Sequence, residues 1–128
     1  MKNIIVLGAF LFTFFSCSTT TETTAKTQSI VGNWVLVQMT GGITGRTTIP
    51  ATTNEIQISK SEIKFYENGT LIATEAYTIE TKKSILGGEK PMVVYSSGNP
   101  SQTIVLEGDK LLLSDECYDC YQREYVKK

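Results

Sequence analysis

The chain has 128 residues, which is enough for one domain and too few for two. Apolar residues make up 41% and charged residues 20% of the sequence, so a fully disordered chain is not expected. Twelve basic and thirteen acidic side chains nearly cancel, which gives no electrostatic reason to bind nucleic acid. Because the chain has no histidine, Ser-His-Asp and Cys-His catalytic sites and His-ligated metal sites are excluded. We therefore expect no enzyme, no cofactor and no metal.

The first residues are typical of an export signal. Met1 and Lys2 form a short basic start, and residues 4–15 are apolar apart from Gly8 and Thr13. Such a segment would extend about 18 Å as a helix, whereas the hydrocarbon core of a membrane is about 30 Å thick. It is too short to span a membrane and has the length of a signal-peptide core, so we predict a signal peptide over residues 1–16.

A cysteine stands where this apolar segment ends. The sequence Phe14-Phe15-Ser16-Cys17 resembles the lipobox of bacterial lipoproteins. The resemblance implies cleavage before Cys17 and attachment of fatty acyl chains such as palmitate to it, which would anchor the protein to the cell envelope, at the outer membrane. Residues 17–29 are rich in threonine and lack large apolar side chains, so they are predicted to form a flexible tether. The alternative is ordinary secretion with an incidental cysteine.

The remaining sequence is typical of short antiparallel strands. No segment in it shows helical periodicity, and short turn signals such as Asn68-Gly69 and Gly108-Asp109 separate the apolar runs. Strands joined by tight turns cannot be parallel neighbours. Eight strands can close into an up-and-down barrel, with a β-sandwich as the alternative. The predicted strands are residues 31–39, 55–59, 62–66, 71–80, 92–95, 102–107, 110–114 and 121–127.

Three motifs occur in this order along the strands: Gly32-Asn-Trp34-Val-Leu36, Ile63-Lys-Phe65-Tyr-Glu-Asn68-Gly69-Thr70 and Cys117-Tyr-Asp-Cys120-Tyr-Gln-Arg-Glu-Tyr125. Together they resemble the lipocalins (calycins) and, more narrowly, the small lipocalin-like lipoproteins of Bacteroidetes-type bacteria. The resemblance implies a lipocalin-like barrel over residues 30–128. It also implies structural roles for Gly32, Trp34 and Arg123, with Trp34 packed under Arg123, and a small apolar or amphipathic ligand.

The turn at Asn68-Gly69 determines which side chains of the next strand face inward. A two-residue type I′ loop would pair Phe65 with Ile72. A three-residue loop with a glycine bulge would pair Phe65 with Leu71 and direct Leu71, Ala73, Glu75, Tyr77 and Ile79 inward. We favour the second arrangement because its inward set is more apolar. It makes Glu75 and Tyr77 candidate ligand-binding residues, the alternative being a solvated Glu75 at the rim or outside.

Two further features lie in predicted turns. Cys117 and Cys120 fall in the last hairpin, where an envelope protein would join them in a disulfide; half of a zinc site or a redox pair is the alternative. The acidic residues around them are expected to form a solvated patch. Residues 40–54 form a long Gly/Thr loop, whose one charge is Arg46, in the place where lipocalin-like barrels have the loop that covers the mouth.

Two functions are compatible with this sequence. The first is a monomeric, lipid-anchored barrel that binds a small apolar or amphipathic ligand. The second is a structural or protein-interaction module whose core is filled by Phe65, Tyr77, Leu106 and Leu112, since eight-stranded barrels are either packed solid or hold one small ligand.

The expected anchor leads to a direct test. Replacing Cys17→Ala should release the protein from membranes, because the chain would then carry no acyl group. Membrane fractionation and incorporation of a labelled fatty acid measure this, and wild-type protein that never takes up the label would contradict the lipoprotein hypothesis.

Overall fold

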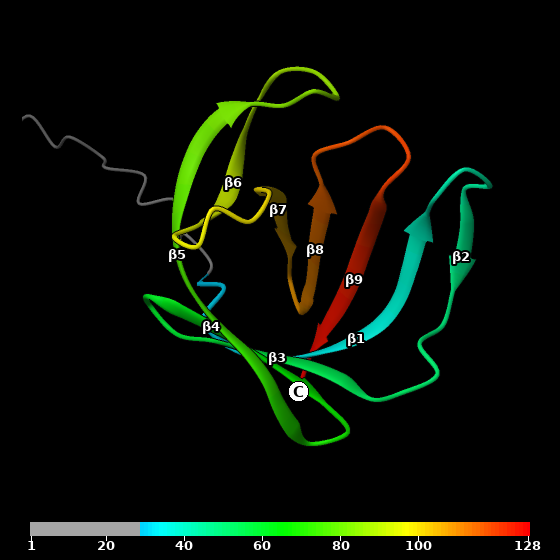
Figure 1. The fold of residues 1–128 in the computed structure, drawn as a ribbon, viewed down its shortest axis with the longest axis vertical. Coiled ribbons are helices and arrows are strands. Elements are labelled where there is room, and N and C mark those ends of the chain that lie inside the picture. The colour runs from blue at the N-terminus through cyan, green and yellow to red at the C-terminus, as the bar shows by residue number, and fades with distance from the viewer. Residues whose placement is uncertain (1–28) are drawn as a thin grey trace, which may run out of the picture.

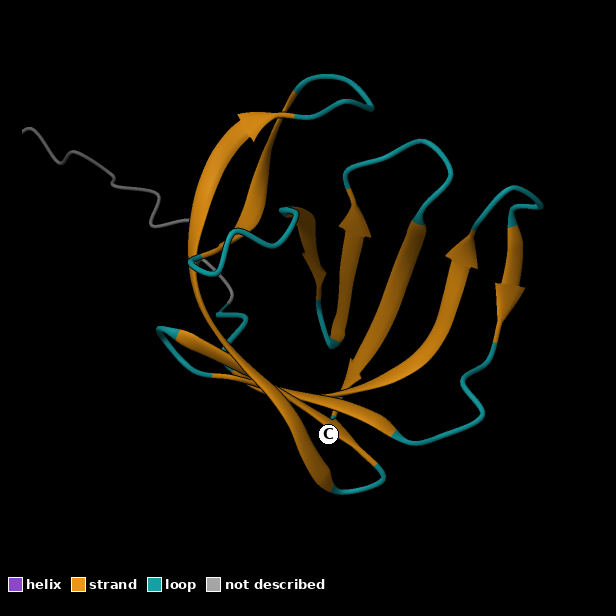
Figure 2. Ribbon diagram, viewed as in Figure 1, coloured by secondary structure: helices purple, strands orange, loops and turns teal. Residues whose placement is uncertain are grey.

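The computed structural model describes residues 29–128, so the predicted signal peptide, the lipidated Cys17 and nearly all of the tether lie outside the described residues. Within this part every regular element is a strand and there is no helix (Figure 2). The all-β prediction is therefore confirmed. The strands are β1 (Gly32–Gly41), β2 (Arg46–Thr48), β3 (Asn54–Ile58), β4 (Glu62–Glu67), β5 (Thr70–Lys83), β6 (Glu89–Tyr95), β7 (Gln102–Glu107), β8 (Lys110–Asp115) and β9 (Tyr121–Lys127).

These strands form one closed antiparallel barrel, as the sequence predicted. From β3 to β9 each strand pairs with the next in the chain, and β1 pairs with β3 on one side and with β9 on the other (Figure 1). The β1–β9 pairing extends from Trp34–Lys127 to Gly41–Tyr121. Closure pairs the backbone N–H and C=O groups that the edge strands of an open sheet would expose, and it excludes the two-sheet sandwich. The eight strands β1 and β3–β9 thus make a lipocalin-like barrel.

The ninth strand, β2, was not predicted. Residues 40–54 were expected to form a loop over the barrel mouth, but the last residues of β1 turn through Gly42 and Gly45 into β2, which pairs with Met39–Gly41. Both glycines have positive φ, 70° and 60°, which suits a tight reversal. In Figure 1 this hairpin lies at the outer edge of β1, so it extends the sheet beside the barrel. Arg46 is exposed on β2.

The core is centred on Trp34, which is 1% exposed, and on Ile58, Ile63 and Leu111 from three other strands. The indole Nε1 of Trp34 donates a hydrogen bond to the Ile30 carbonyl oxygen at 2.8 Å. This bond satisfies the polar atom of an otherwise apolar side chain, so the ring can be buried at little cost.

The predicted contact between Trp34 and Arg123 is wrong. Lys127 Nζ lies 5.7 Å from the centroid of the Trp34 ring, and Lys127 is the β9 residue directly opposite Trp34. Arg123 is opposite Met39, further along β1. In an antiparallel pair the start of β1 meets the end of β9, so the cation over the ring comes from Lys127, the last residue of β9.

The β4–β5 hairpin combines parts of both predicted arrangements. Glu67 pairs with Thr70 across a two-residue turn, and Asn68 and Gly69 have φ of 48° and 77°, as in a type I′ turn. The predicted three-residue loop and its Phe65–Leu71 pair are wrong. A bulge at Ile72 then shifts the register by one residue, so that Phe65 pairs with Ala73. The favoured inward set is therefore correct for Ala73, Glu75 and Tyr77, whereas Ile79 is 46% exposed.

The position of Trp34 can be tested with a double-mutant cycle in urea unfolding. Trp34→Leu and Lys127→Met should show a coupling free energy of about 0.5 kcal/mol. Either single substitution already removes the cation–π contact, so the double mutant cannot lose it a second time. Trp34→Leu with Arg123→Met is the control and should be additive within about 0.3 kcal/mol. Coupling to Arg123 and not to Lys127 would contradict the register described above.

Candidate functional site

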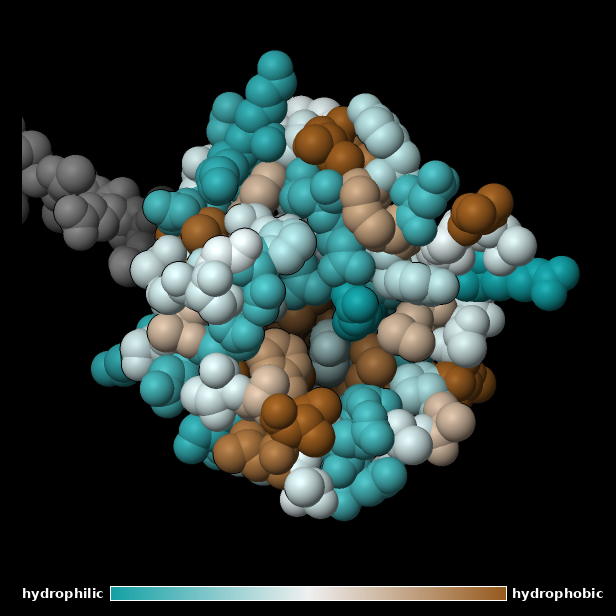
Figure 3. All heavy atoms as spheres, in the orientation of Figure 1, coloured by the Kyte–Doolittle hydropathy of each residue, from teal (hydrophilic) through white to brown (hydrophobic). Residues whose placement is uncertain are grey.

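The barrel interior is only partly filled. Beside the core lies a cavity of about 710 Å³, whose lining residues come from β1, from each of β3–β9 and from two loops. Small-molecule sites are typically about 300–1,000 Å³. Figure 3 shows a hollow near the centre of the molecular face that is turned to the viewer. The interior thus has room for a ligand.

One part of the cavity wall is apolar. Leu36 and Met39 of β1, Ile56 of β3, Phe65 of β4 and Leu113 of β8 line it. Two β1 residues with an odd spacing face inward because a bulge between Leu36 and Gln38 shifts the β1–β9 register. These side chains continue the core into the cavity.

Another part of the wall carries a connected row of polar side chains, Tyr95, Gln102, Asp115 and Arg123, which we term the polar row. The Tyr95 hydroxyl donates to Gln102 Oε1 at 2.7 Å, and Gln102 Nε2 donates to Asp115 Oδ1 at 2.6 Å. Arg123 Nη1 forms an ion pair with the same carboxylate oxygen at 2.7 Å. The row crosses four neighbouring strands, β6 to β9, so it fixes their inner faces relative to one another.

Strand alternation explains why polar side chains meet at this place. On β7 the inward positions are Gln102 and Ile104, and on β8 they are Leu113 and Asp115. Gln102 is directly opposite Asp115 in the β7–β8 hairpin. Each strand therefore changes from apolar to polar along its inner face, at the same level of the barrel.

Two buried tyrosines, Tyr95 of the polar row and Tyr125 of β9, have raised pKa values. Burial raises the pKa of Tyr95 well above its ordinary value, and the nearby Tyr125, Glu75 and Asp115 raise it further while Arg123 opposes them. Burial raises the pKa of Tyr125 to about 12, with Arg123 lowering it and Asp115 raising it. Both phenols are therefore neutral donors at neutral pH.

Glu75 faces the cavity, as the favoured hairpin arrangement predicted. It lines the cavity wall, and its Oε1 accepts a hydrogen bond from Asn99 Nδ2 at 2.8 Å. Asn99 belongs to the loop between β6 and β7, so Glu75 also holds this loop against the barrel.

Tyr77 does not line the cavity. It is buried in the core, and its hydroxyl donates to the Ser59 carbonyl oxygen at 2.7 Å. Its proposed role as a ligand-binding residue is corrected to a core residue. The side chain lies two positions beyond Glu75 along β5, where the interior is already filled.

The loop between β8 and β9 borders the cavity. Cys117 and Cys120 form the predicted disulfide, with a Cα–Cα distance of 5.4 Å, and both residues line the cavity. The thiols are thus not available as zinc ligands. A Cβ at Gly41 would collide with the Cys120 carbonyl group, so the glycine allows β1 and this loop to pack closely.

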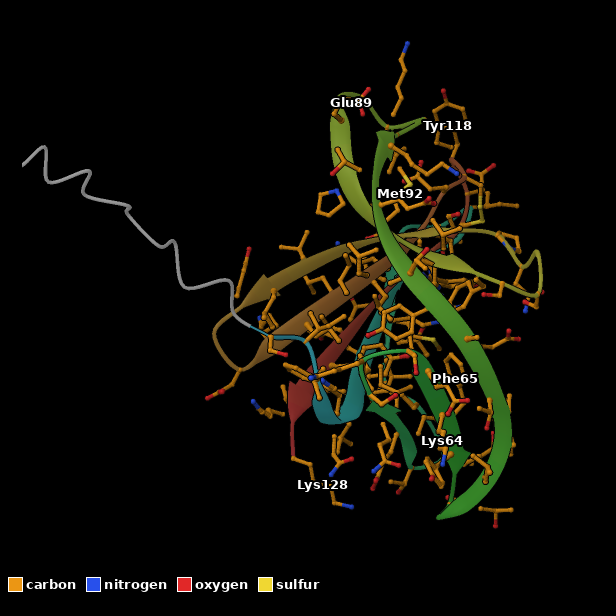
Figure 4. The ribbon with its side chains drawn as sticks, turned by 90° about the vertical axis from the view of Figure 1, so that its left-hand side faces the viewer. Lys64, Phe65, Glu89, Met92, Tyr118 and Lys128 are labelled. Carbon is orange, nitrogen blue, oxygen red and sulfur yellow. A yellow bond between two sulfur atoms is a disulfide. The ribbon has the colours of Figure 1, made fainter. Side chains whose placement is uncertain are left out.

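The predicted solvated acidic patch is correct for Asp119, which is exposed, but not for Asp115 and Glu116. Asp115 belongs to the polar row. Glu116 accepts hydrogen bonds from the Ser84 hydroxyl at 3.0 Å and from the Ile85 backbone N–H at 2.9 Å. Figure 4 shows Tyr118 beside the β5–β6 hairpin that carries Glu89, and the Tyr118 hydroxyl is 3.5 Å from the Ile85 carbonyl oxygen. Glu116 therefore ties two loops together across the rim.

Comparisons of the chain with protein-family models, with curated proteins and with solved structures find no match. Among residues 29–128 no group of three or more His, Cys, Asp or Glu side chains is arranged to hold a metal ion. The same part of the chain contains no helix that is long and apolar enough to cross a membrane. The geometry of the cavity is therefore the main guide to function.

Sequence reasoning found Glu75 but missed Tyr95, Gln102 and Tyr125, and it placed Asp115 among solvated acids. A signal was present for two of these residues. Gln102 is the first residue of β7 and Asp115 is the last residue of β8, and each lies two positions from an apolar inward residue of its strand. Arg123 was given a structural role, and the structure places it on the cavity wall in an ion pair with Asp115.

The raised pKa of Tyr125 predicts a loss of stability at high pH. The unfolded chain releases this proton near pH 10 and the folded protein near pH 12, so the stabilisation is complete below pH 10 and is lost as pH rises toward 12. Tyr125→Phe should reduce the slope by up to about 1.4 kcal/mol per pH unit in urea unfolding between pH 10 and 12. Tyr118→Phe is the matched control, because Tyr118 is 80% exposed, and should leave the slope unchanged. Equal slopes in all three proteins would contradict the assignment.

Proposed function

We propose that this protein is a lipid-anchored envelope lipoprotein whose barrel binds a small amphipathic molecule. The observation that carries the proposal is the cavity of about 710 Å³, which combines an apolar wall with a polar row. An apolar ligand segment placed against Leu36, Ile56 and Phe65 would gain about 0.8 kcal/mol for each buried methylene group. A polar ligand group could then contact the side chains of the polar row. The protein is proposed as a binding protein and not as an enzyme.

The alternative of a filled interaction module has less support. Of the four side chains expected to fill the interior, Tyr77 lies in the core and Leu106 packs against it, whereas Phe65 lines the cavity. Leu112 lies between two inward residues, Leu111 and Leu113, and therefore belongs to the outer face. The large side chains do not fill the interior.

The proposed location rests on the sequence. The signal-like start and the lipobox-like Ser16-Cys17 favour an acylated N-terminus, and the threonine-rich residues that follow would act as a tether. A disulfide between Cys117 and Cys120 is in keeping with an oxidising envelope compartment. A tethered barrel would hold its ligand close to the membrane from which amphipathic molecules come.

Filling the cavity tests the proposal. Ala73 lines the cavity, and Ala76 is exposed on the opposite face of the same strand. With the uncharged fluorescent probe N-phenyl-1-naphthylamine, the wild-type and Ala76→Trp proteins should bind, and Ala73→Trp should bind at least about tenfold more weakly, because its indole occupies the cavity. Native and denaturing mass spectrometry of the purified wild-type protein would identify a co-purified ligand.

Two outcomes would contradict ligand binding in the cavity. One is a wild-type protein that neither binds the probe nor carries a small molecule. The other is equal probe affinity in the Ala73→Trp and Ala76→Trp variants, since the probe would then bind elsewhere on the surface.

A further inference from the structure

The charges that meet beside Tyr95 do not balance. Glu75, Asp115 and Arg123 line the same cavity as Tyr95, and Tyr95 is joined through Gln102 to the Asp115–Arg123 pair. Two of these groups are carboxylates and one is a guanidinium. The group beside Tyr95 therefore carries one negative charge more than its cation can compensate.

The single cation of this group is already engaged. Arg123 is paired with Asp115 at 2.7 Å, and the Asp115 carboxylate also accepts bonds from Gln102 and, at 3.4 Å, from the Tyr121 backbone N–H. An anionic ligand at Arg123 would have to lie next to Asp115 and near Glu75. Like charges at such distances oppose binding, so the pair does not make an anion site.

Within this group Glu75 is the carboxylate without a cation. Two other carboxylates line the cavity: Glu55 is paired with Lys128, and Glu116 accepts its hydrogen bonds from the rim loop between β5 and β6. Its one hydrogen bond within the described residues comes from the neutral amide of Asn99, at 2.8 Å, and no ion pair among residues 29–128 includes it. The side chain is half-buried on the cavity wall. A carboxylate in such a position gains most from a cationic hydrogen-bond donor.

A second feature indicates a polar ligand group at the same place. Tyr125 is 5% exposed and lines the cavity. Within residues 29–128 its hydroxyl has no hydrogen-bond partner, and because no fully buried side-chain polar atom there lacks one, this oxygen is open to the cavity. Tyr95 and Tyr125 also present aromatic rings, which attract cations through their faces. Two aromatic rings and a carboxylate form a combination suited to an ammonium group.

We propose that the ligand of this cavity is a cationic amphiphile, with an ammonium group held by Glu75 beside Tyr95 and Tyr125 and an apolar segment against Phe65 and Leu36. This inference rests on the proposed function, since it names the chemical class of the ligand for the same cavity. The ammonium group would neutralise the excess negative charge, and the Tyr125 hydroxyl would gain a polar partner.

Two probes with the same apolar chain and opposite charge test the inference. Decylammonium and decanoate, each below its micelle concentration, compete for the cavity with N-phenyl-1-naphthylamine at pH 8. The wild-type protein should bind decylammonium at least about tenfold more tightly than decanoate, and added salt should reduce this preference.

Variants on one strand identify the group responsible. Glu75→Gln keeps the size of the side chain and an oxygen acceptor for Asn99, and it should lower decylammonium affinity about tenfold without changing the affinity for the uncharged probe. Glu80→Gln is the matched control, because Glu80 is exposed on the opposite face of β5, and it should bind as the wild type does. Glu75→Lys should reverse the preference toward decanoate.

The possible failures are distinguishable. A wild-type protein that binds the uncharged probe but prefers decanoate, or shows no preference, overturns the inference and leaves the proposed function standing. A preference that survives in Glu75→Gln also overturns it, since another group would then select the charge. A wild-type protein that binds none of the three compounds overturns the proposed function and this inference together.

Discussion

Pairing of the first barrel strand with the last is the constraint on which the rest of the structure depends. The β1–β9 ladder joins residues at the two ends of the folded domain, from Trp34 with Lys127 to Gly41 with Tyr121. Once the sheet is closed, every second side chain must face an enclosed space, so the inward residues of all eight strands share one core and one cavity. Without that closure Tyr95 and Arg123 would belong to a solvated sheet face, and their polar contacts would be worth much less.

The enclosed space is divided by the identity of the inward residues. Trp34, Ile58, Ile63 and Leu111 fill one part, and the polar row occupies the adjoining part. Burying a polar side chain is costly unless its hydrogen bonds are made, and each member of the row bonds to its neighbour. The row is therefore stable as a set, and it prevents the interior from collapsing into a uniformly apolar core. A cavity next to satisfied polar groups is the result.

The sequence predicted the strands well because alternation and turn residues are local signals, and the closed barrel followed from their number. It could not predict β2, whose three residues lack an apolar alternation and pair with β1 through a glycine turn. It misplaced the cation over Trp34, because the register between strands at opposite ends of the chain depends on the whole barrel. Tyr95 and Gln102 were missed for a related reason. Their hydrogen bond joins β6 to β7, and the sequence of one strand alone does not determine its register against the next strand.

The bulge at a single residue, Ile72, determines whether the Glu75 carboxylate faces the cavity. The two-residue turn at Asn68-Gly69, if followed by a regular ladder, would place Thr74 on the inner face and Glu75 on the outer one. The charged groups beside Tyr95 would then reduce to the Asp115–Arg123 pair, which is neutral. The bulge at Ile72 reverses the alternation from Ala73 onward and brings the Glu75 carboxylate to the cavity wall. The bulge interrupts the β4–β5 ladder and leaves Ile72 61% exposed at the border of the cavity, which Ile72 also lines. The same bulge places the Glu75 carboxylate inside the barrel.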